Sequence, residues 1–172
     1  MVETKISKQG RDGESAFNDW LNQNNISFLY LNQDKSRFAS LFSDDVKRPD
    51  FLVLIESIGL LAVDVKNYTH YKDGGYSLGL EKEIRRVITF ERIFRIPVWY
   101  AYFSEKEKSN AWYWISALKA VEVGEVRGEK KKGQEEFLFL KDEHFVRIET
   151  NDDLGRLYTH RFKSYQNLKN FK

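Results

Sequence analysis

The sequence predicts an α/β protein in which helices pack on a mixed central sheet. Two segments with helical spacing of apolar residues, 13–24 and 80–95, are interspersed with short apolar runs of strand length. Two of these runs are separated only by "ESIG" (56–59), which is short enough for a hairpin turn and makes that pair of strands antiparallel. The expected order over residues 13–103 is therefore helix, three strands, helix and strand (αβββαβ), followed by C-terminal strands and a helix.

The composition fits one domain with a substantial core. The chain has 172 residues, of which 41% are hydrophobic and 15% aromatic, and its net charge is only +2. We expect a single domain over 1–172, with a core at about 13–103 and a C-terminal elaboration at about 104–172. Because there is no cysteine, disulfides, thiolate metal sites and cysteine nucleophiles are excluded. The polar N-terminus and the lack of a long apolar run predict a cytoplasmic protein without a membrane partner.

The first half of the chain supplies most of the predicted core. After Asp12, a plausible N-cap, Phe17, Trp20 and Leu21 recur at helical spacing and predict the helix 13–24, with residues 1–11 as a lead-in. Apolar runs then predict three strands, at 26–31, 49–55 and 60–66. The segment that follows, 67–79, is rich in Gly and Tyr and is predicted to be a loop.

The second half begins with the clearest helix of the sequence, 80–95, which Pro97 brings to an end. Aromatic-rich strands are predicted next at 98–103 and 111–117, and a charged loop at 127–136. The pattern over 136–149 predicts a hairpin that turns at "KDEH". Thr150–Asp153 then caps a final amphipathic helix, whose apolar residues are Leu154, Leu157, Tyr158 and Phe162.

Charged residues interrupt the strand 60–66 in an unusual way. Because strand side chains alternate, Asp64 and Lys66 project from one face together with Ala62. Asp50 begins the neighbouring strand, where hairpin pairing brings it towards Asp64. Two adjacent carboxylates repel each other unless a cation lies between them. Mg²⁺ typically binds one or two carboxylates together with water and phosphate, and a lysine beside it suits a water aimed at phosphorus. The alternative is an ordinary solvated strand face.

These residues carry a family resemblance. Pro49-Asp50 followed by Asp64-Val65-Lys66 resembles the signature of the PD-(D/E)XK nuclease superfamily, whose fold is called restriction-endonuclease-like. That group includes type II restriction enzymes, archaeal Holliday-junction resolvases and transposon-end nucleases, and its αβββαβ core matches the order read over somewhat more than half the chain. The resemblance implies that Asp50, Asp64 and the backbone carbonyl of Val65 bind Mg²⁺, with Mn²⁺ as a substitute. It also implies that Lys66 positions or activates the attacking water.

A further acid on the first helix is common in that superfamily. Here Glu14 falls at the edge of the buried stripe, as the family pattern requires. It is equally explained as a first-turn glutamate favoured by the helix dipole.

The helix 80–95 carries a basic face suited to a phosphate backbone, made of Lys82, Arg85, Arg86 and Arg92. A solvated helix with an i,i+4 pair between Glu81 and Arg85 is the competing interpretation. Glu91 lies within the apolar stripe, either as a further site residue or as a partner of Arg95. Tyr68, in the loop after the strand 60–66, is a candidate for stacking on an unpaired base, although Tyr-rich loops often only pack on their own domain.

The sequence thus predicts a Mg²⁺-dependent endonuclease that hydrolyses DNA phosphodiester bonds. Two alternatives remain open: a non-catalytic nucleic-acid- or protein-binding module on the same fold, and an RNA-directed nuclease. Enzymes of the family that cut both strands are often dimers, so a homodimer or a larger nuclease assembly is a further expectation. The histidines at 70, 144 and 160 are too widely spaced to predict a zinc site, and no phosphate-binding glycine loop is present.

Overall fold

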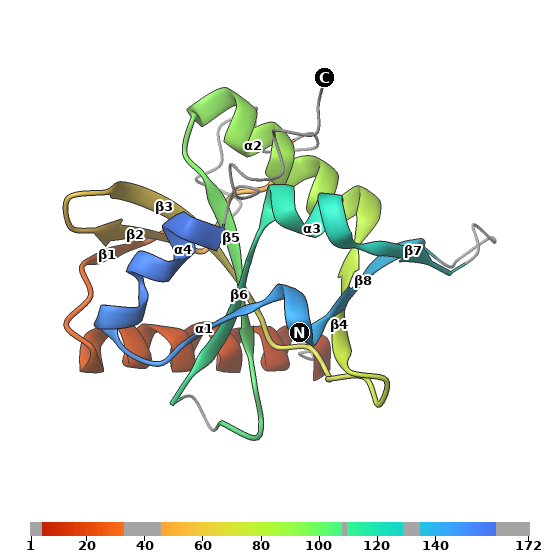
Figure 1. The fold of residues 1–172 in the computed structure, drawn as a ribbon, viewed down its shortest axis with the longest axis horizontal. Coiled ribbons are helices and arrows are strands. Elements are labelled where there is room, and N and C mark those ends of the chain that lie inside the picture. The colour runs from red at the N-terminus through yellow and green to blue at the C-terminus, as the bar shows by residue number, and fades with distance from the viewer. Residues whose placement is uncertain (1–4, 33–45, 108–109, 129–134, 161–172) are drawn as a thin grey trace.

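A six-stranded mixed sheet forms the centre of the protein (Figure 1). The computed structural model describes residues 5–32, 46–107, 110–128 and 135–160. Within these ranges β3 and β5 pair in parallel, and the other strand pairs of this sheet are antiparallel. The strand order is β1 (Phe28–Tyr30), β2 (Phe51–Ile55), β3 (Gly59–Lys66), β5 (Val98–Phe103), β6 (Trp112–Ser116) and β9 (Val146–Ile148). The predicted αβββαβ core and its mixed sheet are therefore confirmed.

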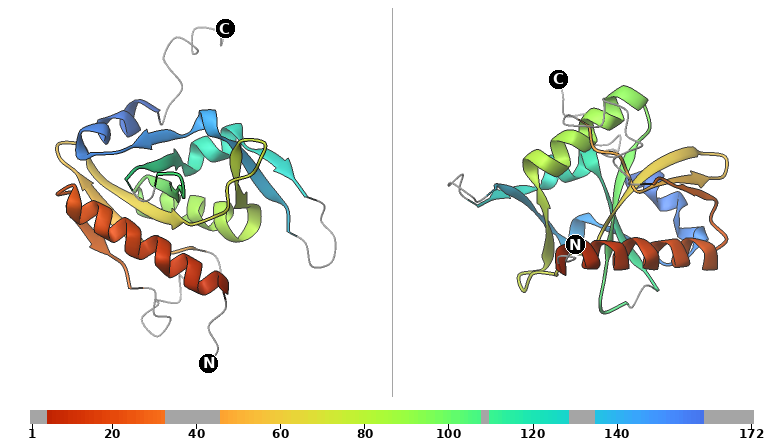
Figure 2. Two further views of the ribbon diagram at one scale, coloured as in Figure 1. Left: turned by 90° about the horizontal axis from the view of Figure 1, so that it is seen from below. Right: turned by 180° about the vertical axis from the view of Figure 1, so that it is seen from behind.

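Helices cover both faces of this sheet (Figure 2). On one face, α1 (Lys5–Gln23) and α4 (Gly155–His160) pack on a core that includes Phe17, Val63 and Trp114. On the other face, α2 (Arg86–Phe94) and α3 (Ala117–Val123) enclose a second core around Tyr100 and Tyr102. The alternation along β3 sends Leu61 and Val63 to the α1 side and Ala62 to the α2 side, as predicted. None of the helices within the described ranges has the length and apolarity needed to cross a membrane.

The first helix is longer than predicted, because α1 begins at Lys5 and Asp12 lies in its interior. The reason is a tertiary contact at the end of β3. The Gln9 side chain donates a hydrogen bond to the Asn67 carbonyl (2.7 Å), and the Asn67 side chain donates one to the Gln9 carbonyl (2.9 Å). A Cβ at Gly13 would lie 2.8 Å from the Asn67 Cβ, so a glycine permits this close approach. Docking on the sheet thus extends a helix whose local sequence is a weak helix former.

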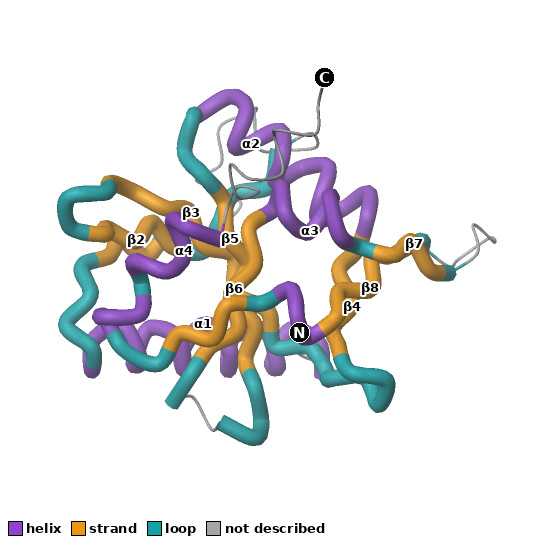
Figure 3. Tube along the Cα trace, viewed as in Figure 1, coloured by secondary structure: helices purple, strands orange, loops and turns teal. Residues whose placement is uncertain are grey.

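A second, three-stranded sheet lies beside the first and was not predicted (Figure 3). Its order is β4 (Gly75–Gly79), β8 (Phe137–Lys141) and β7 (Glu125–Arg127), all antiparallel. The segment 67–79 is therefore only in part the predicted loop. Its second half becomes a strand because β8, more than fifty residues away in sequence, supplies the hydrogen-bonding partner. Local sequence carries no signal for such a pairing.

The predicted hairpin at 136–149 is wrong. A 3₁₀ turn at Asp142–His144 carries the chain from β8 in the small sheet to β9, which pairs with β6 in the large sheet. Helix α3 was also missed, although the Ser116 hydroxyl caps it by accepting a hydrogen bond from the Lys119 N–H (3.1 Å). Of the predicted charged loop 127–136, residues 129–134 lie outside the described residues.

The predicted helix 80–95 consists of a π-helical turn, η3 (Leu80–Arg85), followed by α2. Arg95 adopts a left-handed conformation (φ 58°) and ends the helix two residues before Pro97. The buried residues of the two segments are Ile84, Val87 and Phe90, whereas Phe94, which the pattern places on the buried stripe, is exposed. Phe94 instead stacks on Phe90 at the helix end.

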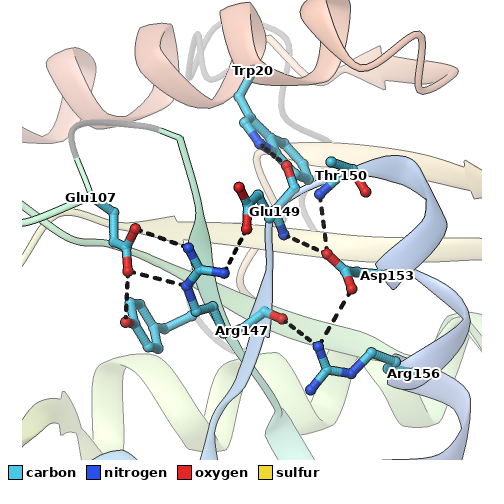
Figure 4. A network of polar contacts seen from close by, with 8 residues as sticks. Trp20, Glu107, Arg147, Glu149, Thr150, Asp153 and Arg156 are labelled. Atoms are coloured by element: carbon cyan, nitrogen blue, oxygen red, sulfur yellow. Dashed lines mark hydrogen bonds and ion pairs between the residues drawn. The ribbon is translucent and has the colours of Figure 1, made fainter.

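A polar network fastens the C-terminal elements to the rest of the fold (Figure 4). Arg147 on β9 pairs with Glu107 and Glu149, and the Trp20 indole of α1 donates a hydrogen bond to the Glu149 carbonyl. Thr150 and Asp153 form the predicted capping box, which begins a 3₁₀ turn (Asn151–Asp153) ahead of α4. Leu154 and Leu157 are buried as predicted, Tyr158 is exposed, and Phe162 lies outside the described residues.

Candidate active site

Asp64 and Lys66 lie at the C-terminal end of β3, on the face that carries η3 and α2. The two residues are almost fully buried, at 1% and 4% exposure, so the solvated strand face is contradicted. β5 runs parallel beside them, with Tyr100 opposite Asp64 and Tyr102 opposite Lys66. Two charged groups are therefore held within an aromatic environment, where an ion must find a partner.

Asp50 lies one residue before the Phe51–Val63 pair of the β2–β3 ladder. Its N–H donates to the Val63 carbonyl (3.0 Å), and its Oδ2 accepts a hydrogen bond from the Val65 N–H (2.8 Å). The side chain is 7% exposed. Burial, followed by the charge of Asp64, raises the pKa of Asp50 well above its usual value. The sheet thus brings two carboxyl groups together and makes ionisation of one of them costly.

Asp64 also belongs to a closed ring of four charged side chains: Lys47, Asp64, Lys66 and Glu83. We call them the charge ring. The Asp64 Oδ2 lies 2.6 Å from Lys66 Nζ and 2.9 Å from Lys47 Nζ. The Glu83 Oε2 lies 2.5 Å from each of the same two nitrogens. Each carboxylate is thereby shared by two ammonium groups, and the ring is neutral as a whole.

The charge ring sets the ionisation of its members. Burial opposes the charge on Asp64, but Lys47 and Lys66 outweigh it and lower the pKa of Asp64 to about 2. Burial likewise opposes the charge on Lys66, yet Asp64 and then Glu83 raise the pKa of Lys66 well above its usual value. In this arrangement Lys66 is an ammonium group. It can donate hydrogen bonds to a water or to a phosphate oxygen, but it has no free electron pair with which to take a proton.

Glu14 reaches the same neighbourhood from α1. The Tyr30 hydroxyl donates a hydrogen bond to the Glu14 Oε2 (3.0 Å). The half-buried position raises the pKa of Glu14, and the charges of Asp64, Lys47 and Lys66 all act on it. The helix edge position read from the sequence therefore directs this carboxyl towards the Asp50–Asp64 pair.

The basic residues of the helix 80–95 are placed less closely. Lys82 pairs with Glu135, and Arg85 pairs with Glu81 at i,i+4 (3.2 Å), so both are engaged at the surface. Arg86 is nearer the ring, since its carbonyl oxygen accepts a hydrogen bond from the Lys47 N–H (3.4 Å). Arg92 is exposed one turn or more further along the helix.

Glu91 and Tyr68, the two remaining candidate site residues, lie at different distances from the charge ring. The Glu91 Oε2 accepts a hydrogen bond from the Val98 N–H (3.0 Å) and so fixes the connection between α2 and β5, away from the ring. The Tyr68 ring lies 5.7 Å from the Lys66 Nζ, in cation–π contact. Tyr68 therefore adjoins the candidate site, whereas Glu91 supports the fold.

Lys47 and Glu83 were not identified from the sequence. Lys47 belongs to a polar connection with no periodic pattern, and Glu83 is one of several charged residues at the start of a helix. The one local signal was that Glu83 precedes the buried Ile84 and so borders the apolar stripe. Tyr100 was also missed: its buried hydroxyl makes no hydrogen bond to any described residue, although the Lys66 Nζ lies 5.6 Å from its ring.

The donor atoms at this position suit a hard divalent cation. Asp50 and Asp64 offer carboxylate oxygens and Val65 a backbone carbonyl, which is the small protein contribution that Mg²⁺ typically uses. Burial and the neighbouring Asp64 raise the pKa of Asp50, so a cation at this position would favour its ionised form. Across the described ranges, no three side chains of His, Cys, Asp or Glu are already arranged as a metal cage. The residues therefore fit a cation that keeps most of its water, provided that Lys47 yields its place on Asp64.

Comparison with known proteins identifies the fold. No family model matches the chain, and no curated protein matches it in sequence. The Holliday junction resolvase Hjc from the archaeal hyperthermophile Archaeoglobus fulgidus has a similar structure, with a TM-score of 0.53 and 14% identity, over 91% of this chain and 99% of its own. The bacterial homing endonuclease I-Ssp6803I matches 77% of this chain and 81% of its own at 17% identity, but its TM-score of 0.43 is too low to support an argument. The chain has the restriction-endonuclease-like fold, which is the fold of the PD-(D/E)XK nucleases that its motif resembles.

Proposed function

We propose that the protein is a metal-dependent endonuclease that hydrolyses phosphodiester bonds of DNA. The observation that carries this proposal is the buried convergence of Asp50, Asp64 and Lys66 at the end of β3. The similar solved structure, whose name identifies it as a Holliday junction resolvase, supports a nuclease on this fold. Burying two carboxyl groups and an ammonium group costs stability, so a functional requirement explains their presence better than folding does.

Each residue has a defined role in this proposal. Asp50, Asp64 and the Val65 carbonyl hold Mg²⁺, or Mn²⁺ in its place. The bound cation would polarise a water and offset the charge of the phosphate. Lys66 donates hydrogen bonds that orient the attacking water or a phosphate oxygen, and Glu83 holds the Lys66 side chain in place. Glu14 helps to order the water from the α1 side.

The surface around the site gives the DNA backbone its cationic contacts. Among the basic helix residues, Arg86 is joined to the charge ring by its backbone contact with Lys47, and Lys82, Arg85 and Arg92 extend the basic surface along the helix. Contacts of this kind position a duplex without reading its sequence. We therefore expect Arg86→Ala to weaken DNA binding more than Arg92→Ala does.

Cleavage assays on linear, branched and single-stranded DNA with Mg²⁺ or Mn²⁺ test the proposal. Wild type is expected to cut, while Asp64→Asn and Lys66→Met are expected to be inactive but folded. Asparagine and methionine keep the size of each side chain, so circular dichroism and thermal melting serve as folding controls. Including RNA substrates separates a DNA enzyme from an RNA enzyme. Failure of the wild type on every substrate with either metal rejects the proposal.

A non-catalytic binding module on the same fold is the second candidate. It is favoured by one observation: the charge ring is already neutral through Lys47 and Lys66, without any metal. Calorimetric titration with Mn²⁺ separates the two candidates. Binding that is lost in Asp50→Asn supports the nuclease, whereas no Asp50-dependent binding supports the module.

A further inference from the structure

A cavity of about 380 Å³ lies on the far side of the loop that follows β3. A larger groove of about 860 Å³ begins at Lys66 and shares three residues with this cavity, namely Tyr68, Thr69 and His70. The groove and the cavity are thus adjacent, with residues 68–70 of the loop between them. Tyr68 lines both, and its ring lies 5.7 Å from the Lys66 Nζ, so the cavity begins one side chain away from the candidate active site.

Aromatic rings line the cavity and are held firmly by their neighbours. Tyr68, Tyr76, Phe103 and Tyr113 all contribute to its walls. Tyr76 is buried, with its ring centroid 4.8 Å from that of Tyr102 and 5.5 Å from that of Phe145. The Tyr113 hydroxyl donates a hydrogen bond to Glu107 (3.2 Å). These rings form a prebuilt surface on which a flat ring can stack.

The loop that follows β3 forms one wall of the cavity and is held in place by contacts with the small sheet and the turn after it. The His70 Nε2 lies 2.9 Å from both carboxylate oxygens of Asp142, and its ring packs edge-on against Tyr76 at 4.9 Å. Further along, Tyr71 pairs with Gly75 and its ring stacks on Phe137. The loop therefore connects β3 to the small sheet at several points, and the cavity does not depend on ligand to take shape.

The polar groups at the cavity identify the kind of ligand that it suits. Glu105, Lys106 and Asp142 line it, so it carries charges of both signs, and His70 engages both oxygens of Asp142. Glu105 can accept a hydrogen bond from an exocyclic amine, and the buried Ser104 supplies a further polar group. An aromatic ring that carries an amine fits both requirements. The volume lies near the lower end of the range for small-molecule sites, about 300–1,000 Å³, which suits a single base.

We propose that this cavity binds one unpaired nucleobase of the nucleic-acid substrate, next to the bond that is cut. The inference rests on the proposed nuclease function and narrows its substrate class. Extruding a base from a duplex costs stacking and pairing energy, and that cost falls when the base is already unpaired. The cavity therefore favours DNA with an unpaired nucleotide beside the scissile phosphate, and favours adenine, cytosine or guanine over thymine, which has no exocyclic amine.

The test is a binding experiment on the full chain in EDTA, where cleavage cannot occur. Two DNAs of equal length are compared: a fully paired duplex, and the same duplex with one unpaired 2-aminopurine. Wild type is expected to bind the second DNA more tightly and to quench its fluorescence through stacking. Tyr113→Ala is expected to weaken binding of that DNA by about 5- to 150-fold, the equivalent of about 1–3 kcal/mol per stacked base, with little effect on the paired duplex.

The controls separate this inference from the nuclease proposal. Tyr158→Ala removes an exposed tyrosine that does not line the cavity and is expected to change neither affinity. Asp142→Ala, at an exposed position, is the second variant and serves in place of Tyr113→Ala if that protein does not fold. Equal wild-type affinity for the two DNAs, or a loss that is the same for both, overturns the base site even if cleavage occurs. A preference for unpaired DNA without cleavage under any metal condition leaves the base site standing and rejects the nuclease.

Discussion

Removing the positive charge of Lys47 should strengthen metal binding. The Lys47 Nζ lies 2.9 Å from the Asp64 Oδ2 and 2.5 Å from the Glu83 Oε2, so an ammonium group already occupies one of the two carboxylates proposed to bind the cation. A divalent ion that binds at Asp64 is either repelled by the nearby Lys47 ammonium group or displaces that group from Asp64. Lys47→Met keeps most of the aliphatic stem and removes the charge.

The magnitude follows from the burial of the pair. Two unit charges 4 Å apart interact by about 1 kcal/mol in bulk water and about 4 kcal/mol at the effective dielectric near a protein surface. The Lys47 side chain is 25% exposed and Asp64 only 1%, which places the pair between these limits. Because Lys47 regains solvation when it is displaced, we take about 1–3 kcal/mol as the amount by which Lys47 weakens the free energy of metal binding. Lys47→Met should therefore lower the dissociation constant for Mn²⁺ by about 5- to 150-fold.

Calorimetric titration with Mn²⁺ in the absence of DNA measures this effect independently of catalysis. Lys119→Met is the matched control, since Lys119 has nearly the same exposure (27%) and also pairs with a glutamate, but lies on α3. Asp50→Asn should abolish the binding and so identifies the site being titrated. An unchanged or weaker Mn²⁺ affinity in Lys47→Met refutes the competition between Lys47 and the metal.

Three further perturbations test other parts of the structure. Glu83→Gln should lower kcat by about 10- to 100-fold without strengthening Mn²⁺ binding, because Glu83 positions Lys66 and its charge offsets that of Lys47; steady-state kinetics and calorimetry together check this. Asp50→Asn should raise the melting temperature at pH 7 without metal. Folding raises the pKa of Asp50, so the native state loses stability as the pH rises from the unfolded-state pKa of 3.8 through the folded-state pKa. The asparagine variant carries no ionisable group at this position and avoids that loss. Equal melting temperatures of the two proteins at pH 7 would contradict the assignment of an unfavourable buried charge. Gly75→Val should lower the melting temperature by about 2–12 °C, because a Cβ there would lie 2.3 Å from the Leu140 carbonyl oxygen, while Gly10→Ala, with no atom within 4 Å, should not.

The sequence predicted those parts of the fold that local patterns determine. Apolar alternation revealed β2, β3 and β5, and Asp64 and Lys66 stood out because they interrupt such a run. Strands of the small sheet escaped prediction, since β4 and β8 form through pairing between segments far apart in the chain. The same reason explains why the hairpin predicted at 136–149 is wrong: β8 pairs with β4 in the small sheet, and β9 pairs with β6 in the large sheet.

The residues of the candidate site likewise divide into those that local patterns revealed and those that only the tertiary fold brings together. Asp50, Asp64 and Lys66 share one hairpin, so their proximity follows from strand register alone. Lys47 and Glu83 reach them from a connection and from η3, which packs on β4 and α2, and only this tertiary arrangement brings the four charges into one ring. Register is a local property that a sequence pattern reveals. The position of a helix on a sheet depends on the whole core.

Glu83 reaches that ring from the π-helical turn. Ile84 is buried in the core on the α2 side of the sheet, and Glu83, its immediate neighbour, contacts both Lys47 and Lys66. Consecutive side chains diverge by about 100° around the axis of an α-helix, and a π-helix has more residues per turn, so Glu83 and Ile84 lie somewhat closer together in direction than in an α-helix. π-Helical turns are rare and are found frequently at functional sites. Here the turn carries a carboxylate that contacts Lys66, which itself lies 2.6 Å from Asp64, and the Glu83→Gln variant tests whether that contact positions Lys66.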